Sequence, residues 1–196
     1  DDLSNSFYSH GGKRLMAATA GVFMNHCIES IAGTYALILR VENPVHLEVG
    51  RLGKLQLVPG FYLYCGSARG PGGVKARVDR HLRKRKKHRW HIDYVSSQVP
   101  IVDVWYSYAE FWHECHWAET AVAWADNQIP YAGFGSSDCH CDAHLIYYHD
   151  QPQVSEFKRR MSQEGVAQSL VEAIASWRSP LPRSCRYRNP DIIAAS

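Results

Sequence analysis

The sequence lacks any long apolar run, and no stretch approaches the roughly 20 consecutive apolar residues that a membrane-spanning helix needs. It also lacks internal repeats and low-complexity segments. Its six cysteines in 196 residues are too few and too irregularly spaced for a disulfide scaffold. These absences predict an ordered cytoplasmic protein with no membrane partner, and the 45% hydrophobic content is enough for one substantial core.

Acidic residues are nearly missing from one segment, Lys75 to His91, which holds nine of the 22 Lys and Arg residues and a single acid, Asp79. This segment carries a net charge of +8, so the rest of the chain carries −5 within the overall +3. A local basic patch suits a polyanion, most simply nucleic-acid phosphate, although a solvated helix face is the alternative. The cations expected to bind nucleic acid are Lys75, Arg80, Arg83, Lys84, Arg85, Lys86, Lys87 and Arg89.

Hydrophobic patterns predict short strands joined by polar turns, which favours an antiparallel sheet. The expected fold class is α/β (α+β), with a small central antiparallel three-stranded sheet flanked by helices and with added N- and C-terminal helices. The three principal strands are expected at 34–41, 61–65 and 101–108, with further strand-like pieces at 54–58 and 145–148.

Helical spacing of apolar residues predicts helices at 15–31, from about 73 into the basic segment, at 113–125, and from 157 to 177. The chain is therefore expected to divide into an N-terminal helical extension (1–32), a main domain (33–150), and a C-terminal helix and tail (151–196). Aromatic and acidic residues around Trp90 and Asp93 either contact bases or phosphates or pack the helix end onto the sheet, and the sequence leaves both readings open.

Particular residues stand at particular places in this order of elements. Gly33-Thr34-Tyr35 opens the first strand, Tyr64-Cys65-Gly66 closes a later one, and Arg77 and His81 lie one turn apart on the next helix. The longer runs PGFYLYCGSARGPGG, KKHRWHIDY and GFGSSDC accompany them, with an E-C pair between the last two. Together these features resemble the GIY-YIG nuclease superfamily, and in particular a branch that is also found fused to endonuclease III-type glycosylases.

The resemblance implies a divalent-metal-dependent endonuclease that hydrolyses DNA phosphodiester bonds with one Mg²⁺ or Mn²⁺ ion, in DNA repair and with a repair protein as a candidate partner. In that superfamily a tyrosine assists the nucleophile, an arginine binds the phosphate, and a glutamate holds the metal ion. Tyr35 and Tyr64 match the two motif tyrosines, Arg77 matches the arginine, and His81 has a counterpart in some members. Ser67 stands where many relatives carry a lysine. Two alternatives stay open, a nucleic-acid-binding module without cleavage and a zinc-stabilised binding domain.

Helical geometry helps to choose the glutamate. At about 100° per residue, Glu114 shares the face of Ala118 and Ala121, whereas Glu119 points about 140° away from it. A carboxylate on an apolar face is costly unless it is paired or binds a metal, so we expect Glu114 to be the metal ligand. The same geometry places Arg77 and His81 at the border of the apolar ridge of their helix.

Cys139, Cys141 and His144 form a C-x-C-x-x-H pattern that could supply zinc ligands, with Cys115 or His140 as a fourth. Zinc modules usually contain two well-spaced ligand pairs, and only one such pair stands here. The sequence therefore favours buried or incidental thiols over a metal site.

Overall fold

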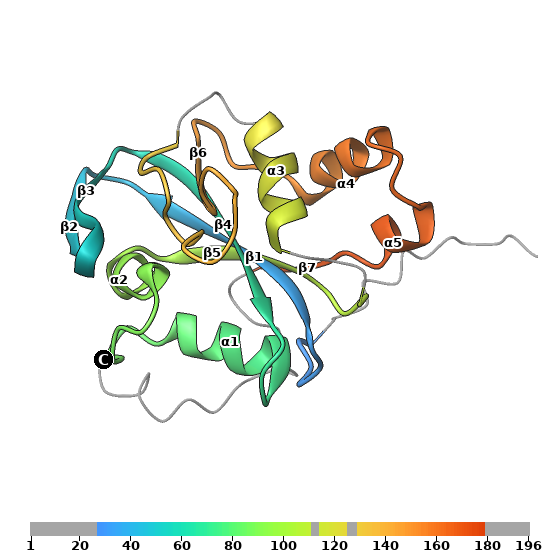
Figure 1. Cartoon of the computed structure of the whole chain (residues 1–196), viewed down its shortest axis with the longest axis horizontal. Coiled ribbons are helices and arrows are strands. Elements are labelled where there is room, and N and C mark those ends of the chain that lie inside the picture. Colours follow the sequence, from blue (N-terminus) through green and yellow to red (C-terminus); the bar gives the residue numbers. More distant parts are fainter. Residues whose placement is uncertain (1–26, 111–113, 125–128, 179–196) are drawn as a thin grey trace, which may run out of the picture.

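The computed structural model describes residues 27–110, 114–124 and 129–178. Within these residues, the centre of the fold is a five-stranded antiparallel sheet in the order β6-β4-β1-β5-β7 (Figure 1). The strands are β1 (Gly33–Val41), β4 (Gly60–Ala68), β5 (Ile101–Ser107), β6 (Leu145–Tyr148) and β7 (Ala175–Arg178). The expected antiparallel sheet with flanking helices is confirmed, but its expected size of three strands is wrong, because β6 and β7 extend it at both edges.

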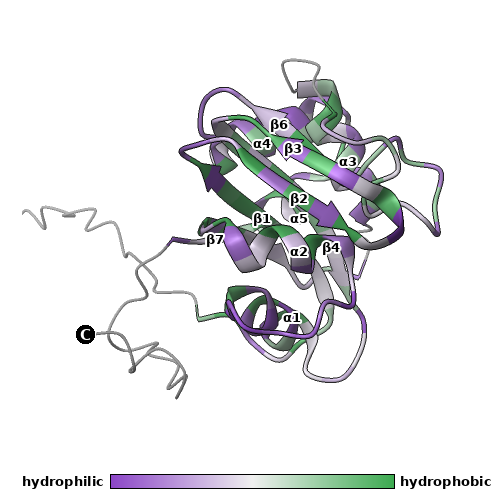
Figure 2. Cartoon of the chain, turned by 90° about the vertical axis from the view of Figure 1, so that its left-hand side faces the viewer, coloured by the Kyte–Doolittle hydropathy of each residue, from purple (hydrophilic) through white to green (hydrophobic). Residues whose placement is uncertain are grey.

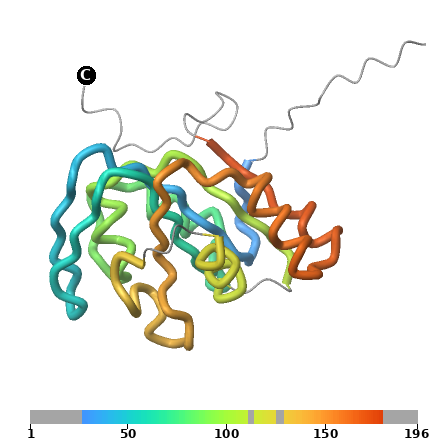
Figure 3. Tube along the Cα trace, turned by 90° about the horizontal axis from the view of Figure 1, so that it is seen from above, coloured from blue at the N-terminus to red at the C-terminus, as the bar shows by residue number. Residues whose placement is uncertain are grey.

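Helices cover both faces of this sheet (Figures 1 and 3). The helices α1 (Gly73–Leu82) and α2 (His91–Gln98) pack on one face, and α3 (Glu114–Trp124), α4 (Val154–Gln163) and α5 (Gln168–Glu172) pack on the other. Successive side chains of a strand point to opposite faces. In β1, Leu37 therefore packs in the core beside α1 and α2, and Ile38 packs in the core beside α3 and α4. This double burial explains the nearly continuous apolar run of the strand.

A separate β-hairpin packs against α2, on the face of the main sheet that α1 and α2 cover. It consists of β2 (Val45–Val49) and β3 (Gly53–Leu57), joined by the 3₁₀ turn η1 (Gly50–Leu52). Buried and exposed residues alternate along both strands, and Figure 2 shows bands of hydrophobic and hydrophilic colour along the same hairpin. The predicted strand at 54–58 is β3, whereas β2 was not predicted.

The sequence had suggested that the helix beginning near residue 73 continues through the basic segment. The structure shows instead that the helix ends within this segment. α1 ends at Leu82, Arg83 has extended backbone angles, and α2 begins only at His91. Asp93 caps this new helix by accepting hydrogen bonds from the backbone N–H groups of Arg89 and Trp90. The break places residues 83–90 in a loop beside the end of α1.

Both terminal helix predictions also change. The expected helix over 157–177 is two helices and a strand, because Gly165 takes a positive φ of 83° after α4 and Trp177 lies in β7. In the expected N-terminal helix, residues 15–26 lie outside the described part of the chain, and residues 27–31 are not helical. The described helices include none that is both long and apolar enough to cross a membrane.

Candidate active site

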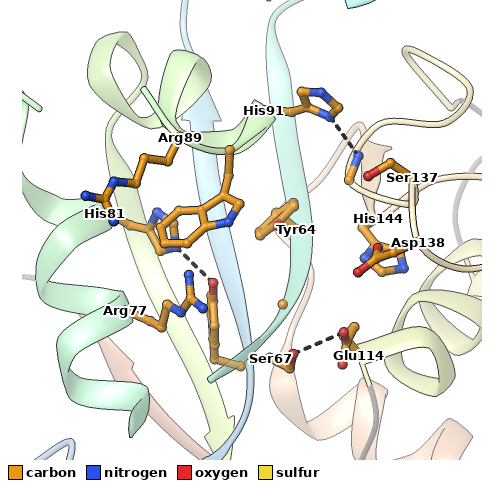
Figure 4. A pocket seen from close by; sticks show the side chains of 14 residues that line it. Tyr64, Ser67, Arg77, His81, Arg89, His91, Glu114, Ser137, Asp138 and His144 are labelled. Carbon is orange, nitrogen blue, oxygen red and sulfur yellow. Dashed lines mark hydrogen bonds between the residues drawn. The ribbon is translucent and has the colours of Figure 1, made fainter. Parts of the chain in front are cut away.

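A cleft of about 270 Å³ opens beside β4, at the point where that strand loses its outer partner. β6 pairs with β4 only from Phe61 to Tyr64, after which the backbone N–H of Cys65 donates to the carbonyl of His144. The five residues predicted from the sequence to act in catalysis or metal binding line this cleft together, namely Tyr35, Tyr64, Arg77, His81 and Glu114. Arg89 and His144, which the sequence also singled out, line it as well. Figure 4 shows Arg77 and His81 on one wall, and Glu114, Asp138 and His144 on the opposite wall.

Tyr35, His81 and Asp93 form a connected series at the floor of the cleft. The Tyr35 hydroxyl lies 2.8 Å from Nε2 of His81, and Nδ1 of His81 lies 3.4 Å from Oδ1 of Asp93. The second contact is too long for a good hydrogen bond. Burial lowers the pKa of His81, although Asp93 acts in the opposite direction. The imidazole is therefore neutral at pH 7, and its Nε2 can accept the Tyr35 proton.

Asp93 is fully buried and holds several groups with its other oxygen. Burial alone would raise the pKa of Asp93, but the close approach of His81 and the hydrogen bonds from Arg89, Arg80 and Trp90 outweigh it and hold that pKa well below its usual range. Oδ2 accepts from the Arg80 guanidinium at 2.8 Å and from the Arg89 backbone at 2.9 Å. Asp93 is consequently an anion that joins the basic loop to His81.

The two tyrosines lie close together around a glycine. Burial raises the pKa of both Tyr35 and Tyr64, and the charge of Arg77 opposes this rise in each case. Both phenols are therefore protonated at neutral pH. A side chain at Gly66 would bring its Cβ to 2.6 Å from the Tyr35 hydroxyl, so only glycine leaves room for that hydroxyl.

Arg77 is held against an aromatic ring. Its guanidinium carbon lies 4.0 Å from the centre of the Trp90 ring, and the guanidinium carbon of Arg80 lies 4.9 Å from the same centre. Stacking of this kind fixes the plane of a guanidinium while leaving its N–H groups able to donate. Trp90 therefore packs against the core, which was one of the two interpretations of the sequence, and its ring also orients Arg77 in the cleft.

Glu114 enters the cleft from the first residue of α3. Its Oε1 accepts a hydrogen bond of 3.0 Å from the Ser67 hydroxyl, whereas Glu119 is exposed on the same helix. Asp138 lines the same wall. A magnesium site commonly uses one or two carboxylates together with water and substrate phosphate. Glu114 and Asp138 are oxygen donors of the kind that such an ion takes, and the Ser67 hydroxyl orients the Glu114 carboxylate.

A second potential metal site lies behind that wall. Cys115, Cys139, Cys141 and His144 place their ligand atoms within 4.8 Å of one another, and this group could hold a metal ion. Cys115 completes the group, and His140, the other candidate from the sequence, does not belong to it.

Part of the basic segment serves the fold. Lys75 pairs with Asp79, Lys84 donates to the carbonyl of Val99, and Lys86 donates to the carbonyl of His81 and to Ser96. Arg80 binds Asp93 and the carbonyl of Lys87 through its Nη2 atom. Besides Lys84, the exposed cations of the loop are Arg83, Arg85, Lys87 and Arg89, and Arg89 also lines the cleft.

Residues 34–166 match the family described as domain of unknown function DUF123. The chain belongs to the DUF123 family. No curated protein and no solved structure matches the chain. In this DUF123 domain the sequence patterns had not assigned roles to Ser67 and Asp138, and had left those of Trp90 and Asp93 open. Only the hydrophilic character of Ser67 and Asp138 could have pointed to them, because their neighbours in the cleft come from distant parts of the chain.

Proposed function

We propose that this DUF123 chain is a divalent-metal-dependent endonuclease that hydrolyses DNA phosphodiester bonds. The observation that supports it most is the meeting, in one cleft, of two tyrosines, an arginine, a histidine and a glutamate from β1, β4, α1 and α3. The resemblance to GIY-YIG nucleases had selected the tyrosines, the arginine and the histidine by their place in the sequence, and helical geometry had selected Glu114. A binding module would need the surface cations but not this set of acid–base groups in one cleft.

The chain's own residues can move the proton of an attacking water. With its pKa raised by burial, Tyr35 is not a free phenolate and acts best as a relay. Its oxygen takes a proton from water while its hydroxyl proton passes to Nε2 of His81, 2.8 Å away. The nearby Asp93 carboxylate stabilises the imidazolium that this transfer creates. Tyr64, beside them, donates its hydroxyl proton toward the phosphate or the water.

Arg77 binds the phosphate in this proposal. The phosphoryl group gains negative charge as the water attacks, and a preoriented guanidinium stabilises that charge more in the transition state than in the ground state. A divalent ion held by Glu114 would supply Lewis-acid stabilisation of the leaving oxygen. The exposed arginine and lysine residues of the 83–89 loop extend the positive surface away from the cleft for the DNA strands.

Paired glutamine substitutions on α3 test the proposal. Glu114→Gln keeps the size and the hydrogen bond from Ser67 but removes the charge that a hard cation needs, so we expect cleavage to fall at least about 100-fold. Glu119→Gln, on the exposed side of α3, is the matched control and should cut at the normal rate. The assay uses nicked, flapped, branched and damaged duplexes with Mg²⁺ or Mn²⁺, and fluorescence anisotropy in Ca²⁺ measures binding separately.

The outcomes distinguish the alternatives. Retained cleavage in Glu114→Gln removes the assignment of the metal ligand. If the unchanged protein binds these duplexes and cuts none of them, the nuclease proposal fails and a nucleic-acid-binding module replaces it.

A further inference from the structure

Three cysteines and one histidine from separate segments meet at the wall of the cleft that carries Glu114 and Asp138, which we call the outer wall. Cys115 lies in the first turn of α3, Cys139 and Cys141 lie in the turns that follow residue 130, and His144 directly precedes β6. The distances from Nε2 of His144 are 3.4 Å to Sγ of Cys139 and 3.9 Å to Sγ of Cys115. The three cysteines of this group are free thiols.

These distances fit a tetrahedral ion. With Zn–S near 2.3 Å and Zn–N near 2.0 Å, the S···N edge of a tetrahedral site is about 3.5 Å and the S···S edge about 3.8 Å. The observed S···N distances bracket the first value, and all ligand atoms lie within 4.8 Å of one another. Three sulfurs and one imidazole form a soft donor set that selects zinc over magnesium or calcium.

The histidine is placed in advance by the backbone around it. His144 is 3% exposed, its N–H donates to the carbonyl of Phe134, and its carbonyl accepts from Cys65. The ring therefore starts from a rigid position at the edge of the sheet. By contrast, residues 135–142 are turns with little buried apolar surface, in which Ser136 is the only buried side chain. A segment of this kind needs a cross-link to hold one conformation.

We infer that Cys115, Cys139, Cys141 and His144 bind one structural Zn²⁺ ion, and that this ion fixes the outer wall of the cleft. Four protein ligands close the coordination shell, which is the arrangement of structural rather than catalytic zinc. Cys115 follows Glu114, and Cys139 follows Asp138, so the ion fastens the backbone one residue away from both wall carboxylates. This inference reverses the preference drawn from the sequence, and it holds whether or not the cleft cuts DNA.

The test uses the full chain, without a histidine tag, purified without added metal. After dialysis, we expect elemental analysis by inductively coupled plasma mass spectrometry to find one zinc ion per chain. Replacement by Co²⁺ should give the visible absorption bands of a tetrahedral thiolate site. Cys139→Ser should lose the metal on dialysis, and the neighbouring His140→Ala, which removes an exposed ligand-type residue outside the group, should keep it.

A second measurement on the unchanged protein avoids any dependence on the folding of the variant. A strong chelator should release the zinc and make three protected thiols reactive, and hydrogen exchange should then increase in residues 130–144 and at the start of α3, but not in α1. Protein that carries no zinc and shows no tetrahedral Co²⁺ spectrum overturns the metal site. Zinc whose removal leaves exchange in residues 130–144 unchanged overturns its role in the wall.

Discussion

Gly66→Ala is expected to disturb the cleft through a single methyl group. A Cβ at this position would lie 2.6 Å from the Tyr35 hydroxyl and 2.7 Å from the ring carbon that carries it. Ordinary van der Waals contact begins at 3.4 Å, so the hydroxyl or the backbone has to move by about 0.8 Å. The Tyr35 hydroxyl cannot make that movement and keep its 2.8 Å hydrogen bond to His81.

The magnitude follows from two costs. Overpacking a close-packed core costs about 1 to 3 kcal/mol. Leaving the buried Nε2 of His81 without its partner costs about 1 to 3 kcal/mol more. We therefore expect the free energy of unfolding to fall by about 2 to 6 kcal/mol, which lowers Tm by about 4 to 24 °C in a chain of this size. Cleavage should fall with it, because the displaced hydroxyl is the proposed proton relay.

Urea unfolding measures this effect in a cycle of four proteins, namely the unchanged protein, the two single variants and the double variant, with a fifth protein as control. Gly66→Ala is made in the natural background and in a Tyr35→Leu background, where neither the hydroxyl nor its ring carbon is present. Gly70→Ala is the matched control, because a Cβ there has no neighbour within 4 Å and we expect a change below about 0.5 kcal/mol. The alanine should cost at least about 1 kcal/mol less in the Tyr35→Leu background than in the natural one. An equal cost in both backgrounds would refute the steric argument.

Two further perturbations address charge. Asp93→Asn should lower stability at pH 7 by about 3 to 5 kcal/mol, because it leaves Arg80 without its buried partner. The pKa of Asp93 lies below the ordinary 3.8, so its contribution to stability is full above about pH 4 and is lost as the pH falls further toward the lowered pKa. Thermal melts between about pH 2 and pH 5 should therefore show a smaller fall in Tm with decreasing pH for the variant than for the unchanged protein. Replacing Arg85 and Lys87 together by glutamine should reduce the log–log salt slope of DNA binding by up to about 2, whereas Lys54→Gln on β3, outside the basic segment, should not. Equal slopes would exclude the 83–89 loop from binding.

The sequence predicts those parts of the fold that rest on local patterns. β1, β4 and β5 were visible because strands buried on both faces leave nearly continuous apolar runs. The helical wheel of α3 likewise separated Glu114, which lies in the cleft, from the exposed Glu119. β7 was missed because four residues carry little period, and the spacing from Ile174 to Trp177 also suits a helix.

The contacts that organise the site depend on tertiary structure. Asp93 reaches His81 across twelve residues of sequence because the chain breaks its helix at Leu82 and returns. Ser67 meets Glu114 from another element, and the choice of Cys115 over His140 depends on how α3 packs against the turns beyond it. Residue type made these side chains candidates, but their partners could be assigned only from the fold.

The point at which β6 stops pairing with β4 has a consequence for how this family can diversify. The wall that carries Tyr35 and Arg77 is built into the core, whereas Ser137, Asp138 and His140 on the opposite side are exposed next to Cys139. Substitutions there alter the width and charge of the opening without disturbing the packed interior. New substrate preferences can therefore evolve in a few surface residues while the groups proposed for the reaction stay unchanged.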